Sequence, residues 1–186
     1  MSNQVDFGPL AELIGVWKGD KGTDLAPEPD GAEVNPYSET ITYAAVGDVT
    51  NAESQVLAVV RYHLEVMHKE NNSKIHDETG YWIWDAKTET VINSLIIPRA
   101  VCVLAGGKFD SKVDENGQLT LDVEATIDHS DWNIIQSPFM KEKARTNSFN
   151  RTVTVGNGKM KYFQSTKLSI YGKEFDHTDE NELFRQ

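Results

Sequence analysis

The sequence has only one cysteine and no long apolar run. Cys102 has no second cysteine to pair with, which excludes an intrachain disulfide and is typical of a protein from a reducing compartment. No stretch reaches the roughly 20 apolar residues that a membrane-spanning helix needs. The first residues, Met1 to Asp6, have neither the basic start nor the apolar run of a signal peptide. We therefore expect a cytoplasmic protein.

Basic residues are scarce relative to acidic ones. The chain has 18 Lys and Arg against 29 Asp and Glu, a formal charge of −11. Affinity for nucleic acid comes mainly from basic side chains that neutralise phosphates, and an anionic membrane surface repels an acidic chain. We expect neither nucleic acid nor a membrane as a partner. The acidity itself requires no function beyond solubility.

The motifs of several common enzyme classes are also missing. The sequence contains no HExxH or CxxC motif, no glycine-rich phosphate loop between a strand and a helix, and no nucleophile elbow around a serine. A zinc hydrolase is therefore not expected. The residues alone show no catalytic constellation and leave open whether the protein is an enzyme.

The sequence does contain β-strand patterning over nearly its whole length. Apolar and polar residues alternate from Val56 to Val66 and from Leu119 to Ile127, which predicts half-buried strands. Asn116-Gly117 and Asn157-Gly158 are typical of hairpin turns, because Asn and Gly tolerate positive φ. We predict ten strands, near residues 15–20, 38–46, 54–67, 76–85, 89–97, 100–110, 118–127, 144–155, 159–169 and 174–184.

Short strands joined by tight turns predict a meander, and closure into a barrel removes its exposed edges. We expect residues 1–186 to form a single all-β domain, an antiparallel up-and-down barrel of about ten strands with one short helical turn near its start. Such a barrel can hold a small ligand. A β-sandwich is the alternative. Residues 24–31 read as an exposed loop, and residues 129–140 as a flap over the barrel mouth or a long connection.

His177 is the first candidate for chemistry. In an extended strand it shares a face with Phe175, Asp179, Asn181 and Leu183, while acidic residues and a threonine occupy the other face. This parity predicts an inward imidazole, and a neutral imidazole with one free nitrogen is a good ligand for haem iron. An interior histidine satisfied by a hydrogen bond is the plainer alternative.

His76 is the second candidate. It shares strand parity with Glu78, Trp82 and Trp84, while Tyr81 lies on the opposite face. Both faces carry aromatic residues, so parity does not decide which is interior. Aromatic rings beside a histidine could form the wall of a site for a flat ligand, or could be core packing.

Three segments, in this order, resemble the nitrobindin family of haem-binding β-barrels, which includes the C-terminal domain of a THAP-type protein. The segment from Gly15 to Gly22 is similar to the family's Gly-x-Trp-x-Gly-x-Gly opening. His76-Asp-Glu-Thr-Gly-Tyr81 is similar to its His-x-Glu-Ser-Gly-Tyr strand. The final strand, from His177 to Leu183, carries a single histidine before a Leu-containing end, as in that family.

The resemblance implies a barrel that holds haem b near one open end, with His177 as the iron ligand. His76 would line the same cavity, with Trp17 and Trp82 in its wall and Arg145 or Lys143 beside the haem propionates. Members of the family react with nitrogen oxides and are associated with the isomerisation of peroxynitrite to nitrate. The alternative is a lipocalin-like or fatty-acid-binding-protein-like carrier of an apolar small molecule without haem.

The chain also departs from the family pattern. Lys21 stands where the opening signature has its third glycine. The run from Ile96 to Gly107 is more apolar than the family's strand, and Pro98 within it predicts a kink or a strand boundary. A divergent branch that kept the barrel and changed its ligand would show departures of this kind.

Overall fold

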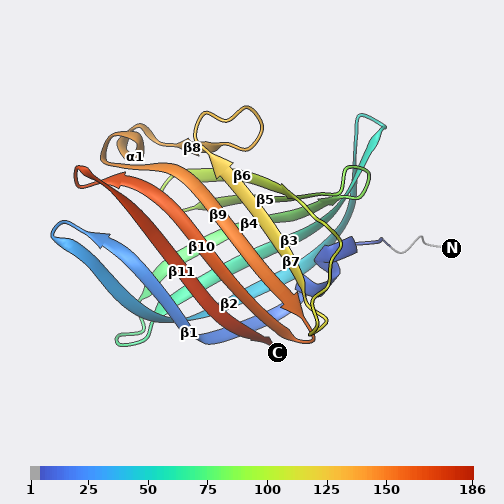
Figure 1. Ribbon diagram of the computed structural model, residues 1–186, viewed down its shortest axis with the longest axis horizontal. Helices are drawn as coiled ribbons and strands as arrows, with labels where there is room; N and C mark the ends of the chain where they lie inside the picture. Colours follow the sequence, from blue (N-terminus) through green and yellow to red (C-terminus); the bar gives the residue numbers. More distant parts are fainter. Residues whose placement is uncertain (1–4) are drawn as a thin grey trace.

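The computed structural model describes residues 5–186, which form an antiparallel β-barrel preceded by a short 3-10 helix, η1 (Figure 1). The expected all-β barrel with a helical turn at its start is confirmed. The elements are η1 (Gly8–Leu13), β1 (Gly15–Glu28), β2 (Gly31–Asn51), β3 (Gln55–His68), β4 (Lys74–Asp85), β5 (Thr90–Ile97), β6 (Val101–Lys108), β7 (Leu119–Thr126), β8 (Ile134–Gln136), α1 (Pro138–Lys143), β9 (Ala144–Gly156), β10 (Lys159–Ile170) and β11 (Lys173–Arg185).

Ten of the strands close into a ring. The sheet runs β5-β4-β3-β2-β1-β11-β10-β9-β7-β6, and β5 pairs with β6 along its whole length to complete it. Closure leaves no edge in the ring to pair with another chain, as the meander predicts. Pro98 lies in the turn between β5 and β6, so the strand boundary expected there is confirmed.

Besides the ten strands of the ring, the structure has a short additional strand, β8, which sequence patterning does not predict. It lies in the segment 129–140 and pairs with Val101–Val103 of β6, along the edge of β6 that pairs with β7 at Gly106. Helix α1 follows at once, with the Ser137 side chain accepting a hydrogen bond from the Met140 amide. Within residues 5–186, neither helix is long and apolar enough to span a membrane.

The hairpin of β1 and β2 is much longer than predicted. Residues 24–31 were expected to form an exposed loop, and this expectation is wrong, because Asp24 to Glu28 continue β1 and pair with Gly31 to Asn35 of β2. The two prolines of the segment do not prevent this. Pro27 is near the end of β1 and Pro29 is in the turn, where a missing amide is tolerated. Asp24 is thereby brought onto the barrel wall.

A β-bulge explains why Lys21 stands in place of a glycine. The register of β1 against β2 shifts between Gly19 and Gly22, so one extra residue is inserted there. Gly22 is therefore the next buried position after Gly19. A Cβ on Gly22 would lie 2.1 Å from the ring of Tyr37, so this position requires glycine.

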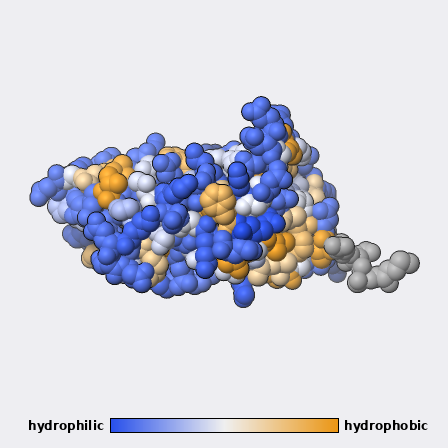
Figure 2. Space-filling view, turned by 90° about the horizontal axis from the view of Figure 1, so that it is seen from below, coloured by the Kyte–Doolittle hydropathy of each residue, from blue (hydrophilic) through white to orange (hydrophobic). Residues whose placement is uncertain are grey.

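The two ends of the barrel differ. The end nearer η1, on the right in Figure 1, is closed by Leu10 and Leu13, which are fully buried and join the main core. The turns between β1 and β2 and between β10 and β11 lie at the other end. The outer face seen in Figure 2 is mostly hydrophilic, as a charge of −11 leads one to expect.

Candidate functional site

The inward-facing residues become accessible towards the end of the barrel opposite η1. On β11, Leu183 and Asn181 are 0% and 3% exposed, whereas Asp179 and His177 are partly exposed. The same change occurs along β4, where Trp82 is buried and His76 is not. We call this solvent-accessible part of the interior the open-end recess, and the buried polar layer below it the floor.

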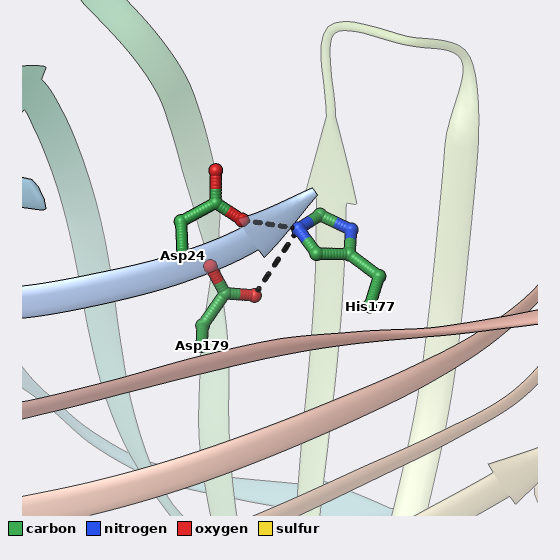
Figure 3. Close-up of side chains that lie close together, drawn as sticks. All are labelled: Asp24, His177 and Asp179. Atoms are coloured by element: carbon green, nitrogen blue, oxygen red, sulfur yellow. Dashed lines mark hydrogen bonds and ion pairs between the residues drawn. The ribbon is translucent and has the colours of Figure 1, made fainter. Parts of the chain in front are cut away.

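His177 lies in the wall of the recess. Its Nε2 is 2.7 Å from Oδ1 of Asp24 and 3.8 Å from Oδ2 of Asp179 (Figure 3). Burial lowers the pKa of His177, but the hydrogen bond with Asp24 and the charges of Asp179 and Asp24 outweigh it, so the pKa lies above its usual value. The imidazole faces inward, as its strand parity predicts, and the nitrogen that faces inward is held by a carboxylate.

Asp24 and Asp179 are brought together by strand pairing. They are opposite each other in the register of β1 and β11, and His177 lies two residues from Asp179 on the same face. Asn35 donates a hydrogen bond to Oδ2 of Asp24 at 3.3 Å, and Gln164 donates one to Oδ2 of Asp179 at 3.4 Å. Both carboxylates are thus oriented by residues other than Asp24, His177 and Asp179 themselves. Burial and the charge of Asp24 raise the pKa of Asp179.

The floor of the recess contains a buried ion pair. Arg151 on β9 donates to both carboxylate oxygens of Glu78 on β4, at 2.7 and 2.9 Å, and to Asn93 at 3.1 Å. Tyr62 donates a short hydrogen bond to Glu78. Burial would raise the pKa of Glu78, but the Arg151 guanidinium more than offsets it and holds the pKa well below its usual range. The interior of the barrel therefore contains a buried, charged and hydrogen-bonded layer.

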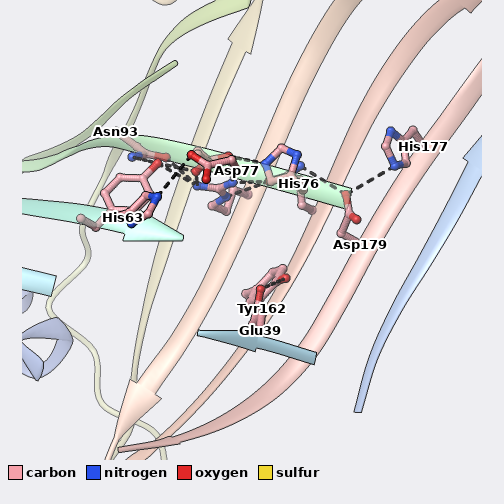
Figure 4. Close-up of polar contacts among 12 residues, drawn as sticks. Glu39, His63, His76, Asp77, Asn93, Tyr162, His177 and Asp179 are labelled. Atoms are coloured by element: carbon pink, nitrogen blue, oxygen red, sulfur yellow. Dashed lines mark hydrogen bonds and ion pairs between the residues drawn. The ribbon is translucent and has the colours of Figure 1, made fainter. Parts of the chain in front are cut away.

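His76 contacts the same floor from above. Its face of β4 is the interior one, with Nε2 at 3.4 Å from Oε2 of Glu78. Figure 4 shows His76, His177 and the polar groups between them. The connection runs through Asp179, Gln164, Arg151 and Glu78 in turn. The two histidines are therefore linked by hydrogen bonds and ion pairs and do not share one direct contact.

A second buried network lies beside the first. Tyr162 donates to Oε2 of Glu39 at 3.0 Å and is 2.6 Å from the hydroxyl of Tyr37, while Asn181 donates to Oε1 of Glu39 at 3.2 Å. Burial raises the pKa of Glu39 to about 8, and the hydrogen bonds only partly offset it. Among residues 5–186, every fully buried side-chain nitrogen and oxygen has a hydrogen-bond partner.

The other residues expected around a haem lie elsewhere. Trp17 is fully buried, donates to the carbonyl of Leu13 at 2.7 Å and packs under Arg185, so it belongs to the core near η1. Trp82 is six residues from His76 along β4, about 20 Å at the usual strand rise, and is also core. Arg145 is exposed and 3.8 Å from Asp128. These three side chains are not gathered around His177.

Sequence reasoning missed the partners of His177. Asp179 could have been found, because it follows His177 by two residues on the same strand face. Asp24 could not, since its segment looks like a loop and only pairing with β11 brings it to the site. Arg99, in the turn between β5 and β6, also acts on His177, because its charge lowers the pKa of that histidine. The floor could have been predicted from Glu78 and Arg151, because each is a charged residue on the same strand face as apolar residues.

At the open end of the barrel, the partly exposed His177 is a donor of the kind that haem iron binds. A haem iron would need the inward nitrogen of that ring, which Asp24 Oδ1 now contacts at 2.7 Å. The arrangement is compatible with iron taking Nε2 in place of the carboxylate. His177 is within reach of solvent, with 30% of its side chain exposed, so a ligand entering from the open end can reach it.

The comparisons with known proteins concern the fold and the family. The crystal structure of Rv2717c from M. tuberculosis superposes with a TM-score of 0.71 at 19% sequence identity, covering 97% of this chain and 99% of that one, which shows a shared fold. No curated protein matches the sequence. The family model described as THAP4-like, heme-binding beta-barrel domain matches residues 6–185. Since this match spans nearly the whole chain, the protein belongs to the family of THAP4-like, haem-binding β-barrel domains.

Proposed function

We propose that the protein binds haem b in the open-end recess, with His177 as the axial ligand of the iron. The observation that carries the proposal is the position of His177, on the interior wall of an accessible recess in a barrel of a haem-binding family. The ring already points its Nε2 inward, so ligation requires no turn of the strand.

Asp24 controls whether that nitrogen is free. While its carboxylate accepts a hydrogen bond from Nε2–H, that nitrogen carries a proton and has no free lone pair for iron. Haem and Asp24 therefore compete for one atom of His177. Asp24 lies on the extended hairpin, and Asn35 holds its other oxygen. The bound state would leave Asp24 with its hydrogen bond from Asn35 only.

Other residues would hold the rest of the group. Arg99 is exposed in the turn between β5 and β6 and acts electrostatically on His177, which suits it to pair with a propionate. His76, with 31% of its side chain exposed, lines the recess above Glu78. When bound, haem would supply the chemistry for isomerising peroxynitrite to nitrate.

Hemin titration tests the proposal. The wild-type protein should give a Soret band that saturates at one equivalent, and His177→Ala should abolish or shift that band while the far-UV circular dichroism stays the same. Asp24→Asn, whose amide is a weaker competitor for Nε2, should bind hemin at least threefold more tightly. An unchanged Soret band in His177→Ala would exclude the axial role.

Two further measurements separate the possible uses of the recess. Peroxynitrite decay should be accelerated by the ferric haem-loaded protein beyond the rate with an equal amount of free hemin, and equal rates would exclude isomerisation. A wild-type protein that does not bind hemin but binds a fluorescent fatty acid tightly would be a carrier of an apolar molecule. The polar floor of Arg151 and Glu78 argues against that outcome.

A further inference from the structure

The three groups around Nε2 of His177 are suited to a ligand other than haem. Oxygens from Asp24 and Asp179 and a nitrogen from His177 all lie within 4.8 Å of one another, on two adjacent strands. We infer that Asp24, His177 and Asp179 form a binding site for a divalent first-row transition metal ion, such as Zn²⁺ or Mn²⁺. This site does not depend on haem binding and uses the same nitrogen, so the two ligands exclude each other.

The distances from His177 are close to those between donors bound to one ion. Ligand atoms bound to one such ion at about 2.0–2.2 Å are separated from each other by about 2.8–4.2 Å, depending on the coordination geometry. Nε2 of His177 is 2.7 Å from Asp24 Oδ1 and 3.8 Å from Asp179 Oδ2. The oxygens of Asp24 and Asp179 lie within 4.8 Å of each other, so small adjustments of the carboxylates would bring all three donors to one ion.

The charges also favour a cation. Two carboxylates share a single imidazole, and the buried guanidinium nearby, that of Arg151, makes both of its close ion contacts with Glu78. A divalent ion would neutralise Asp24 and Asp179 together. One imidazole with two carboxylates suits Zn²⁺, Mn²⁺ or Fe²⁺, whereas an all-oxygen set would suit Mg²⁺ or Ca²⁺.

Hydrogen bonds from outside the group orient both carboxylates. Asn35 donates to Asp24, and Gln164, itself held by Arg151, donates to Asp179. Outer partners of this kind are typical of metal sites, where they fix the direction of the ligand oxygens. The side chains of Asp24, His177 and Asp179 are 14%, 30% and 22% exposed, so an ion can enter from the open end and keep water on its remaining coordination positions.

The barrel contains a second group of similar residues that serves as a control. His63, Glu65 and Asp77 also lie within 4.8 Å of one another, on β3 and β4. This second group differs from the first because Lys74 already bridges its two carboxylates, at 2.6 Å from Glu65 and 2.9 Å from Asp77. A side-chain ammonium there takes the place that a metal ion would occupy. Substitution of His63 should not affect binding in the recess.

Calorimetric titration of the haem-free, chelator-treated full chain with Zn²⁺, and separately with Mn²⁺, tests the site. One equivalent should bind, and Asp179→Asn and His177→Ala should each weaken the affinity at least tenfold, whereas His63→Ala should leave it within twofold. Circular dichroism and thermal unfolding of each variant show that the fold is kept. If His177→Ala does not fold, Asp179→Asn and Asp24→Asn carry the test.

Hemin titration of the same variants separates this inference from the proposed function. Asp24→Asn should weaken Zn²⁺ binding at least tenfold and strengthen hemin binding, while Asp179→Asn should weaken Zn²⁺ binding and leave hemin binding within threefold. Saturable Zn²⁺ binding without a Soret band would support the metal site and exclude haem. Absence of one-equivalent binding of both ions, or equal affinity in the wild type and Asp179→Asn, would overturn the metal site.

Discussion

At the scale of single residues, Arg151 is the side chain on which the floor depends. Its guanidinium contacts Glu78, Asn93 and Gln164, and only 8% of its side chain is exposed. Taking such a pair out of water is costly, and the gain in Coulomb energy offsets that cost only while both partners are present. The pair is therefore a point where a single substitution leaves a buried, uncompensated charge.

We expect Arg151→Met to lower the free energy of unfolding by about 3–5 kcal/mol, because the Glu78 carboxylate loses its partner in the interior. Urea unfolding of the wild type and the variant measures this loss. The double variant Arg151→Met with Glu78→Gln should recover at least half of it, since no buried charge then remains. A loss below about 1 kcal/mol in the single variant would contradict the structural account of the floor.

Glu39 predicts a pH dependence of stability. Its pKa is about 8 in the folded protein against an ordinary value of 4.5, so between these values the folded state holds one proton more than the unfolded chain. The free energy of unfolding should therefore fall as pH rises from 4.5 towards 8, by up to about 1.4 kcal/mol per pH unit, and the contribution should be constant outside that window.

Glu39→Gln removes this titration and keeps a hydrogen-bonding group beside Tyr162 and Asn181. Urea unfolding at pH 5, 6, 7 and 8 should give a difference between wild type and variant that changes in favour of the variant as pH rises. Using the difference cancels the other titrating groups. A difference that stays constant over this range would show that Glu39 has an ordinary pKa.

At the scale of elements, sequence patterning predicts what depends on neighbours along the chain. Alternation found the interior face of β11, and Pro98 marked the end of β5, because both effects are local. The strand pairing that carries Asp24 to Asp179 is set by residues more than 150 positions apart, which no window of sequence contains. The bulge before Gly22 could not be predicted from the sequence either, because one inserted residue reverses the alternation of inward and outward side chains and has no sequence pattern of its own.

The pairing of β4 with β5 depends on a glycine. A Cβ on Gly80 would lie 2.0 Å from the carbonyl oxygen of Ser94, a backbone atom of β5 that cannot turn away. Gly80→Ala should therefore push the strands apart and lower the free energy of unfolding by about 1–3 kcal/mol. Gly31→Ala is the matched control, since a Cβ there meets nothing within 4 Å. Equal stability of the two variants in urea would mean that β4 and β5 are not so close.

At the scale of the whole molecule, the two ends of the barrel differ in burial. Trp17 and Leu13 are fully buried near η1, whereas His177 and Asp24 at the open end are partly exposed. Sequence parity predicted an inward His177 and did not decide which face of its strand His76 shares with the interior. The structure divides the interior into a core, a polar floor and a recess. The core and the recess differ because η1 closes one end of the barrel to solvent.

This division predicts that the closed end can be weakened without changing the recess. Leu10 is fully buried in η1, and η1 packs against β4 and β9. Leu10→Ala should lower the free energy of unfolding by about 2–5 kcal/mol in one transition, seen alike by circular dichroism and tryptophan fluorescence. Val34→Ala, at a side chain 62% exposed on β2, should change the free energy of unfolding by less than about 0.5 kcal/mol.

Zn²⁺ affinity in the recess should stay within twofold in both variants. Loss of Zn²⁺ binding in a folded Leu10→Ala protein would mean that the two ends are coupled.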